Sequence, residues 1–184
     1  MRGWIDSGKP ACYTQPERQV RGMLLLAKKC SELNFSQLMA VYEESNLENA
    51  QMLWQDLSES EQLLRAEREF YGYLREDFFR TPESYYAIWE EDGQYRSALR
   101  IEPYQDGVLL EALETRPDCR GKGYATMLMQ AVLTRETRKI YSHVSKKNTA
   151  SLRTHERCGF RKILDHAVYI DGSVSSNSVT LCKE

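Results

Sequence analysis

Residues 108–125 read VLLEALET followed by RPDCRGKGYA, an apolar run and then a glycine-rich turn. The run has the composition of a largely buried β-strand. The turn leads into an amphipathic helix, since the i, i+3, i+4, i+7, i+8 spacing is kept by Tyr124, Met127, Leu128, Ala131 and Val132. A turn of this kind at the start of a helix presents free backbone N–H groups and the positive end of the helix dipole. The stretch therefore predicts a strand–loop–helix unit that attracts an anion.

Phosphate is the anion that this loop fits best. Gly121 and Gly123 allow a close approach of the backbone, while Arg120 and Lys122 add positive charge. The loop lacks the GxxxxGK[ST] pattern of a P-loop and the GxGxxG pattern of a dinucleotide-binding fold. Taken alone, it fits a tight strand-to-helix turn equally well, and both interpretations stay open.

Periodicity and turn signals organise the rest of the chain as one mixed α/β domain. Capping boxes start two helices, at Asn34 with Gln37 and at Ser58 with Glu61. Strands are expected at residues 23–29, 85–89, 95–101, 108–115, 140–144, 161–170 and 174–181, and a short helix at 148–158. The expected order is β-α-α-β-β-β-α-β-α-β-β, with residues 1–22 as an extension before a domain of residues 23–184.

Composition excludes several classes of protein. The 184 residues carry 25 basic and 27 acidic side chains, and the net charge of −2 argues against a dedicated nucleic-acid partner. No apolar run is long enough to cross a membrane, so no membrane partner is expected. The five cysteines form no CxxC pair and lie at no zinc-ligand spacing. They are typical of reduced thiols in the cytoplasm, and no metal is expected.

The small net charge hides a division along the chain. Between Val41 and Asp92, fourteen acidic residues face four basic ones, whereas between Arg116 and Lys162 twelve basic residues face three acidic ones. Each half alone reads as a solvated helical surface. Together, the halves suit a polyanion at one side and a cation at the other.

A second segment, KKNTASLRTHERCGF at residues 146–160, gives the loop a context. Residues 120–125 match the (Q/R)xxGx(G/A) acyl-CoA pyrophosphate loop of the GNAT acetyltransferase superfamily. Residues 148–160, with Asn148-x-x-Ser151 and a final Gly-Phe pair, look like its second characteristic segment. The order of strands and helices also agrees, so the chain resembles this superfamily over about residues 23–184.

The resemblance implies acetyl-CoA as co-substrate and a sheet that is splayed between its fourth and fifth strands. The pantetheine arm would insert there against the main chain of Leu113, Glu114 and Thr115. The pyrophosphate would lie on the loop made of Arg120, Gly121, Lys122, Gly123, Tyr124 and Ala125. Asn148 would bind the cofactor arm, and Ser151 would lie near its phosphate end.

Acetyl transfer to an ammonium acceptor needs a base. Period-two alternation places Leu109, Glu111, Leu113 and Thr115 on one face of the fourth strand, and superfamily members often carry an acidic residue there. Glu111 is therefore the candidate base, and Glu114, on the opposite face, is the weaker one. The alternative is that Glu111 is an edge residue or bonds to a neighbouring strand.

His155 stands where many superfamily members have the tyrosine that protonates the leaving thiolate. Two interpretations have equal weight: a histidine that relays this proton, or one that packs beneath the last helix at i+3 from Leu152. Tyr124 is expected to pack in the core or the loop rather than to act in catalysis.

The function expected from the sequence is a cytoplasmic N-acetyltransferase that moves acetyl from acetyl-CoA to a primary amine of a small molecule by direct attack in a ternary complex. One alternative is a CoA-binding sensor without catalysis; another is acetylation of a peptide N-terminus or lysine. Many relatives pair, so a homodimer is plausible.

Overall fold

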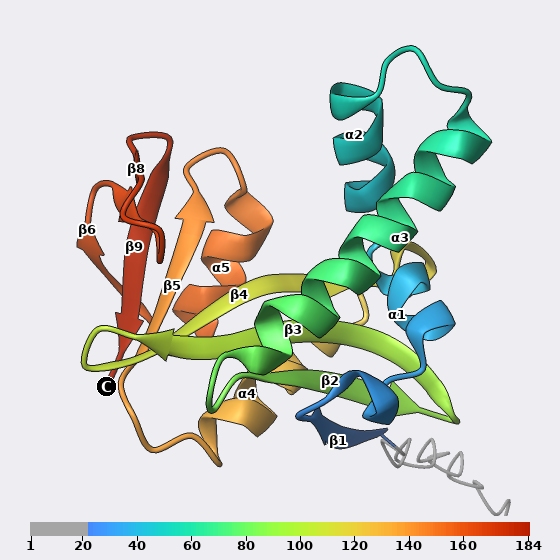
Figure 1. Cartoon of the computed structure of the whole chain (residues 1–184). Coiled ribbons are helices and arrows are strands. Elements are labelled where there is room, and N and C mark those ends of the chain that lie inside the picture. The colour runs from blue at the N-terminus through green and yellow to red at the C-terminus, as the bar shows by residue number, and fades with distance from the viewer. Residues whose placement is uncertain (1–21) are drawn as a thin grey trace, which may run out of the picture.

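The computed structural model describes residues 22–184, in which a seven-stranded sheet has the order β1-β2-β3-β4-β5-β9-β6 (Figure 1). The expected extension of residues 1–22 lies outside the described residues except for Gly22, which begins β1. All paired strands of this sheet are antiparallel except β4 and β5. Within residues 22–184, no helix is long and apolar enough to cross a membrane.

The strands are β1 (Gly22–Ala27), β2 (Tyr85–Glu91), β3 (Gln94–Tyr104), β4 (Gly107–Thr115), β5 (Ile140–Ser145), β6 (Arg161–Leu164) and β9 (Ser178–Lys183), with a separate small ribbon of β7 (Ala167–Val168) and β8 (Val174–Ser175). The helices are α1 (Phe35–Val41), α2 (Glu43–Leu53), α3 (Glu59–Glu76), α4 (Tyr124–Leu133) and α5 (Thr149–Arg157). Short 3₁₀ turns cover Cys30–Glu32, Phe78–Arg80 and Pro117–Cys119.

The predicted fold class and order of elements are confirmed, with two differences. Three helices rather than two precede β2, because the acidic segment Glu43–Leu53 forms α2 although its apolar residues keep no clear helical stripe. The last two strands are interrupted: the expected strand 161–170 divides into β6 and β7, and the expected strand 174–181 divides into β8 and β9.

The two predicted capping boxes have different outcomes. At α3, the Glu61 carboxylate accepts a hydrogen bond from the Ser58 N–H at 3.0 Å, as expected. At α1, the Asn34 side chain accepts from the Gln37 N–H at 3.2 Å. The Gln37 side chain was expected to reach back to Asn34 and instead bonds the β2–β3 turn, accepting from Tyr95 N–H at 2.8 Å and donating to the Gly93 carbonyl. Gln37 therefore docks α1 onto the sheet.

Helices cover the sheet on both faces and bury a core on each. One core packs α4 and the end of α5 against Leu99, Ile101 and Leu110 of the central strands. The other core packs α1 and α3 against Tyr86 and Ile88 of β2. In Figure 1, α2 and the start of α3 extend away from the sheet as a helical arm. Residues of β4 thus alternate between two different packed layers.

The parallel pairing of β4 with β5 is short. It joins Val108, Leu109 and Leu110 to Ile140, Tyr141 and Ser142, after which the two strands separate. At the start of this pairing, the Val108 N–H donates to the Lys139 carbonyl at 2.9 Å. The expected splay between the fourth and fifth strands is confirmed.

Gly107→Ala tests this junction. A Cβ at Gly107 would lie 2.1 Å from the Lys139 carbonyl oxygen, so the backbone must shift where β4 meets β5. We expect a loss of about 1–3 kcal/mol in the free energy of unfolding, the usual cost of overpacking. Thermal or denaturant unfolding measures it.

Gly72→Ala in α3 is the matched control. A Cβ there meets no atom within 4 Å, and alanine is favoured over glycine in a helix by about 0.5–1 kcal/mol. The control is therefore expected to stabilise the protein. An unchanged unfolding midpoint for Gly107→Ala would contradict the close contact at the junction.

Candidate active site

A cleft of about 770 Å³ opens where β4 and β5 separate. Its walls come from the end of β4, the loop before α4, the end of β5, α5 and one side of α2. The residues predicted from sequence that line it are Glu111, Leu113, Glu114, Thr115, Arg120, Gly121, Gly123, Tyr124, Ala125, Asn148, Ser151 and His155. Of the predicted site residues, Lys122 alone does not line it. The structure therefore brings segments 111–125 and 148–155 to one cavity.

The loop before α4 leaves the first amides of that helix without a side-chain cap. Gly121 and Gly123 have φ of +75° and +86°, the left-handed region that glycine adopts without strain. Gly123 is the N-cap and offers no side chain to the helix. The N–H groups that follow it at Tyr124 and Ala125 are among the orphan donors of a helix start, and the dipole adds positive potential. This end of the cleft suits a phosphate.

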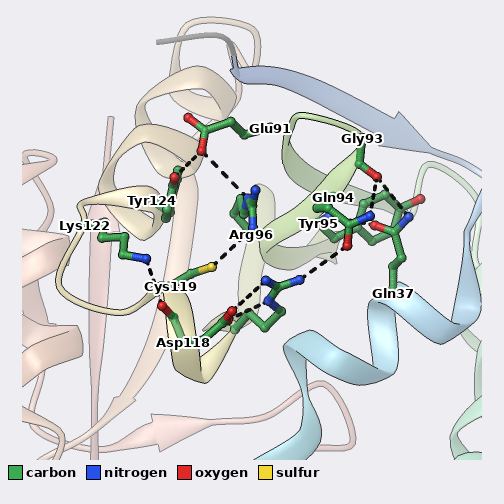
Figure 2. Close-up of polar contacts among 11 residues, drawn as sticks. Gln37, Glu91, Gly93, Gln94, Tyr95, Arg96, Asp118, Cys119, Lys122 and Tyr124 are labelled. Carbon is green, nitrogen blue, oxygen red and sulfur yellow. Dashed lines mark hydrogen bonds and ion pairs between the residues drawn. The ribbon is translucent and has the colours of Figure 1, made fainter. Parts of the chain in front are cut away.

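Side chains of the β2–β3 hairpin contact the loop before α4 and the first residue of that helix, as Figure 2 shows. The Tyr124 hydroxyl donates a hydrogen bond to the Glu91 carboxylate, which also pairs with Arg96 at 3.8 Å. One Arg96 nitrogen lies 3.7 Å from the sulfur of Cys119 in the loop. This supports the interpretation of Tyr124 as a packing residue, because its hydroxyl is committed and its ring is buried.

The basic residues of the loop also have partners. The Lys122 ammonium donates to the Asp118 carbonyl at 2.9 Å, closing the 3₁₀ turn (Figure 2). Arg120 pairs with Glu44 of α2 and donates to the Thr115 carbonyl at 3.3 Å. An anion bound at the loop therefore competes with Glu44 for the Arg120 guanidinium, an exposed pair of the kind that contributes little to stability.

Asn148 and Ser151 form the start of α5. The Asn148 side chain caps the helix by accepting from the Ser151 N–H at 2.9 Å, which leaves the amide NH₂ of Asn148 to donate into the cleft. Among the neighbouring basic residues, Lys146 pairs with Asp165 at 3.0 Å. Arg157, which the sequence analysis did not single out, lines the cleft instead.

A β-bulge changes the expected alternation along β4. The pairing with β3 shifts between Ala98 and Arg100, and Ala112 has φ of +49°. Leu113 packs with the α4 layer, whereas Ala112 packs with the α1 and α3 layer. The prediction that Glu111 shares a face with Leu113 was wrong, because the extra residue reverses the alternation.

Glu111 precedes the bulge and alternates normally with Leu110, so it lies on the α3 side of the sheet, where it meets Arg100 of β3. The two side chains form an ion pair at 2.8 Å, and both are mostly buried. The Arg100 guanidinium also lies over the ring of Tyr73 at 5.1 Å. Glu111 thus bonds a neighbouring strand, as one interpretation expected, and it also lines the cleft. Its role as the base stays a prediction.

Glu114 is on the same side as Glu111, contrary to the expectation that they face opposite ways. Burial and the nearby carboxylates of Glu44 and Glu48 raise the pKa of the Glu114 carboxyl. A hydrogen bond from Ser45 acts in the opposite direction and lowers it. All four of these residues line the cleft. The wall formed by α2 and the end of β4 is therefore acidic, whereas the loop before α4 has a positive potential.

His155 is 1% exposed and both its ring nitrogens have partners. Nδ1 lies 2.8 Å from the Ser151 carbonyl oxygen, which only accepts, so Nδ1 carries the proton. Nε2 then accepts from the Ser142 hydroxyl at 2.9 Å. Burial lowers the pKa of His155, which keeps the ring neutral. This geometry favours the packed histidine over the proton relay.

Sequence reasoning missed three groups on the Glu111 side of the sheet: Arg100, Glu102 and His143. Arg100 and Glu102 alternate along β3 with the period that brings them to one face, which was the available signal. His143 lines the cleft from β5, and its Nδ1 is 3.2 Å from the Thr180 hydroxyl oxygen. Within residues 22–184, no group of three His, Cys, Asp or Glu side chains is placed to hold a metal ion.

Comparison with known proteins agrees with this geometry. The model of the acetyltransferase (GNAT) family matches residues 40–160. No curated protein matches the sequence. Solved structures that are similar in fold include an N-acetyltransferase from Staphylococcus aureus Mu50, with 15% identity and a TM-score of 0.52 over 89% of this chain and 98% of that one.

Two further similar structures bear on ligands. One is the PaiA N-acetyltransferase from Thermoplasma acidophilum in complex with coenzyme A, with 10% identity, a TM-score of 0.56, and coverage of 88% of this chain and 99% of that one. The other is a spermidine N-acetyltransferase chimera from Vibrio cholerae SpeG and hSSAT, with 17% identity, a TM-score of 0.53, and coverage of 88% and 93%.

A sheet that opens beside an amide-lined loop at a helix start is the architecture of acyltransferases that use acyl-CoA. Within that class, the chain belongs to the GNAT acetyltransferase family, whose model matches more than half of its length. Membership supports acetyl-CoA-dependent acetyl transfer as its activity.

Gly123→Asp is expected to abolish CoA binding, because an acidic side chain would repel phosphate from the first amides of α4. A Cβ at Gly123 meets no atom within 4 Å, so the protein should still fold. Calorimetric titration with CoA measures the effect. Gly172→Asp is the control, since its φ of +81° and open surroundings impose the same backbone strain away from the cleft. Undiminished affinity in Gly123→Asp would mean that the loop is only a turn.

His155→Phe distinguishes the two interpretations of His155. A packing role predicts a loss of about 1–3 kcal/mol in unfolding free energy, because the Ser142 hydroxyl loses its buried partner. Turnover per folded molecule should then stay within a few fold of wild type. A relay role predicts turnover per folded molecule lower by roughly 10²-fold, whatever the change in melting.

Proposed function

We propose that this protein is an N-acetyltransferase that moves acetyl from acetyl-CoA to a primary amine of a small molecule, by direct attack in a ternary complex. One observation carries the proposal: a single cleft joins an amide-lined anion loop to an acidic wall, and Glu111 lines the same cleft. The loop suits the pyrophosphate and the wall suits an ammonium group.

The residues present fit acetyl-CoA. Gly123 leaves the amides of Tyr124 and Ala125 for the pyrophosphate, and Asn148 has a free amide NH₂ for the cofactor arm. Beyond Leu110 the main chain of β4 has no paired strand on its β5 side. Its remaining backbone groups there are available to pantetheine in the manner of an added strand. When bound, acetyl-CoA supplies the thioester carbonyl that the amine attacks.

The bulge supports a fixed donor for that carbonyl oxygen. The Tyr42 hydroxyl donates to the Ala112 carbonyl at 2.8 Å, which holds this peptide in one orientation. In a planar trans peptide the N–H points opposite to the C=O, so the Leu113 N–H faces away from Tyr42. Leu113 lines the cleft. Its N–H is the donor we assign to the oxyanion, and a donor held in place needs no reorganisation during the reaction.

Glu111 is the base in this proposal. The Arg100 guanidinium, at 2.8 Å, fixes the direction of its carboxylate, which would take a proton from the bound ammonium directly or through a water. The acceptor would approach along the wall of Glu44, Glu48 and Glu114, which attracts cations. A polyamine has the charge that this wall would select, and the similar chimera from Vibrio cholerae SpeG and hSSAT is a spermidine N-acetyltransferase.

The proposal is tested by incubating the protein with acetyl-CoA and a panel of amines while free thiol is followed. Polyamines, monoamines, neutral-tailed amines and peptides with free N-termini make up the panel. Faster release with polycationic amines than with peptides supports the proposal. CoA binding without transfer to any amine would point to a sensor, and transfer to peptides alone would point to protein acetylation.

Glu111→Gln should lower turnover by roughly 10²-fold, the usual scale for loss of a general base, with little change in CoA affinity. Raising the pH should partly restore the rate, because more of the amine then arrives neutral. The turnover–pH profile is measured beside a melting curve, since the variant also deprives Arg100 of its ion pair. Normal turnover per folded molecule at neutral pH would exclude Glu111 as the base.

A further inference from the structure

Behind Glu111 lies a second carboxyl group that the mechanism above does not use. Glu102 of β3 is 8% exposed and does not line the cleft. Its backbone pairs with Leu109, while that of Arg100 pairs with Glu111. Glu102 is thus the diagonal neighbour of Glu111 across the β3–β4 ladder, a separation that two glutamate side chains can bridge.

We propose that Glu102 is a positioning residue that shares one proton with Glu111 and makes Glu111 basic enough to deprotonate the acceptor amine. This inference rests on the proposed function. In it, both carboxyls start ionised beside Arg100. The N–H bond of the ammonium breaks, its electron pair stays on the nitrogen, and one O–H bond forms on the carboxyl pair, which then shares this single proton. The pair later returns this proton to solvent, so no other reactant is consumed.

Arg100 is the reason that a second carboxyl is needed. Its guanidinium remains charged, and it holds Glu111 at 2.8 Å. A neighbouring cation favours the ionised form of a carboxyl group and so makes a carboxylate a weaker base. The charge of Glu102 offsets that of Arg100, and the three groups together keep a place for one proton.

The surroundings of Glu102 agree with this role. Burial first, and then the Glu111 carboxyl as hydrogen-bond partner and as charge, raise the pKa of Glu102 to about 7, while Arg100 and Tyr73 oppose them. The titratable groups that face this pair or Arg100 are Tyr42, which follows α1, Tyr73 of α3, Tyr86 of β2 and His143 of β5.

The pH dependence of stability gives a test that does not need activity. A carboxyl whose pKa is raised binds its proton more tightly in the folded than in the unfolded chain. Folding therefore loses stability as the pH rises from the ordinary value of 4.5 toward about 7. Glu102→Gln removes this loss. The melting temperature of the variant, relative to wild type, should increase from pH 5 to pH 8.

The rate profile tests the link to Glu111. In Glu102→Gln the acidic limb of turnover should move to lower pH by one unit or more, and the rate at neutral pH should fall roughly tenfold because the base is weaker. Glu102→Asp restores a carboxyl and should bring the limb back toward neutral pH. Glu136→Gln is the control, because it removes another buried carboxylate, the partner of Arg138, outside the cleft. It should lower the melting temperature and leave the limb in place.

Three results would overturn the inference. A melting difference that is constant with pH means that Glu102 does not hold the proton. If the acidic limb of the turnover–pH profile of Glu102→Gln lies at the wild-type pH, the pair does not tune the base. The same conclusion follows if Glu102→Asp does not bring the limb back toward the wild-type pH. If wild type transfers acetyl to no amine, the proposed function fails, and the melting series still decides whether Glu102 holds a proton.

Discussion

Beyond Leu110, β4 runs on to Thr115 with no strand paired on its β5 side, and the site depends on this interruption. An unpaired strand edge inside a sheet leaves backbone N–H and C=O groups without partners in the protein. A bound ligand, or water when no ligand is bound, must form their hydrogen bonds. Helical layers are packed on both faces of the sheet, with α4 and α5 on one side and α1 and α3 on the other (Figure 1). The cleft opens where the pairing of β4 with β5 ends, and the positions of the residues along it are set by these strands.

Charge divides the cleft in the same way as it divides the sequence. The loop before α4 and the start of α5 offer amides and the end of α5 offers Arg157, whereas α2 and the end of β4 offer Glu44, Glu48 and Glu114. The Arg120–Glu44 ion pair spans the two sides. Because both partners are half exposed, this pair is screened and weak, and it yields readily to a phosphate.

The buried charges on the α3 side of the sheet constrain the structure more strongly than the exposed Arg120–Glu44 pair does. Arg100 lies among aromatic rings and a carboxylate, where an unpaired charge would be costly. Its pairing with Glu111 therefore contributes to folding as well as to the site. Glu111 lies on this face immediately before the bulge at Ala112, and the Tyr42 hydroxyl secures the bulge by binding the Ala112 carbonyl. Stability and chemistry share these residues.

Apart from α2 and the breaks in the last two strands, the sequence by itself determined the order of elements, the loop of Gly121 and Gly123, and the cap at Asn148, because periodicity, glycine and capping signals act within a few residues. It also placed segments 111–125 and 148–155 at one site through their resemblance to a family. Only the tertiary structure decided that Leu113 faces away from Glu111, since that depends on a register shift against β3. It also decided that both ring nitrogens of His155 form hydrogen bonds, with Ser142 and Ser151, and that Arg100 and Glu102 lie next to Glu111. The protonation of a buried group is set by charges and hydrogen bonds from other strands and helices, and one segment of sequence does not specify which of these will face it.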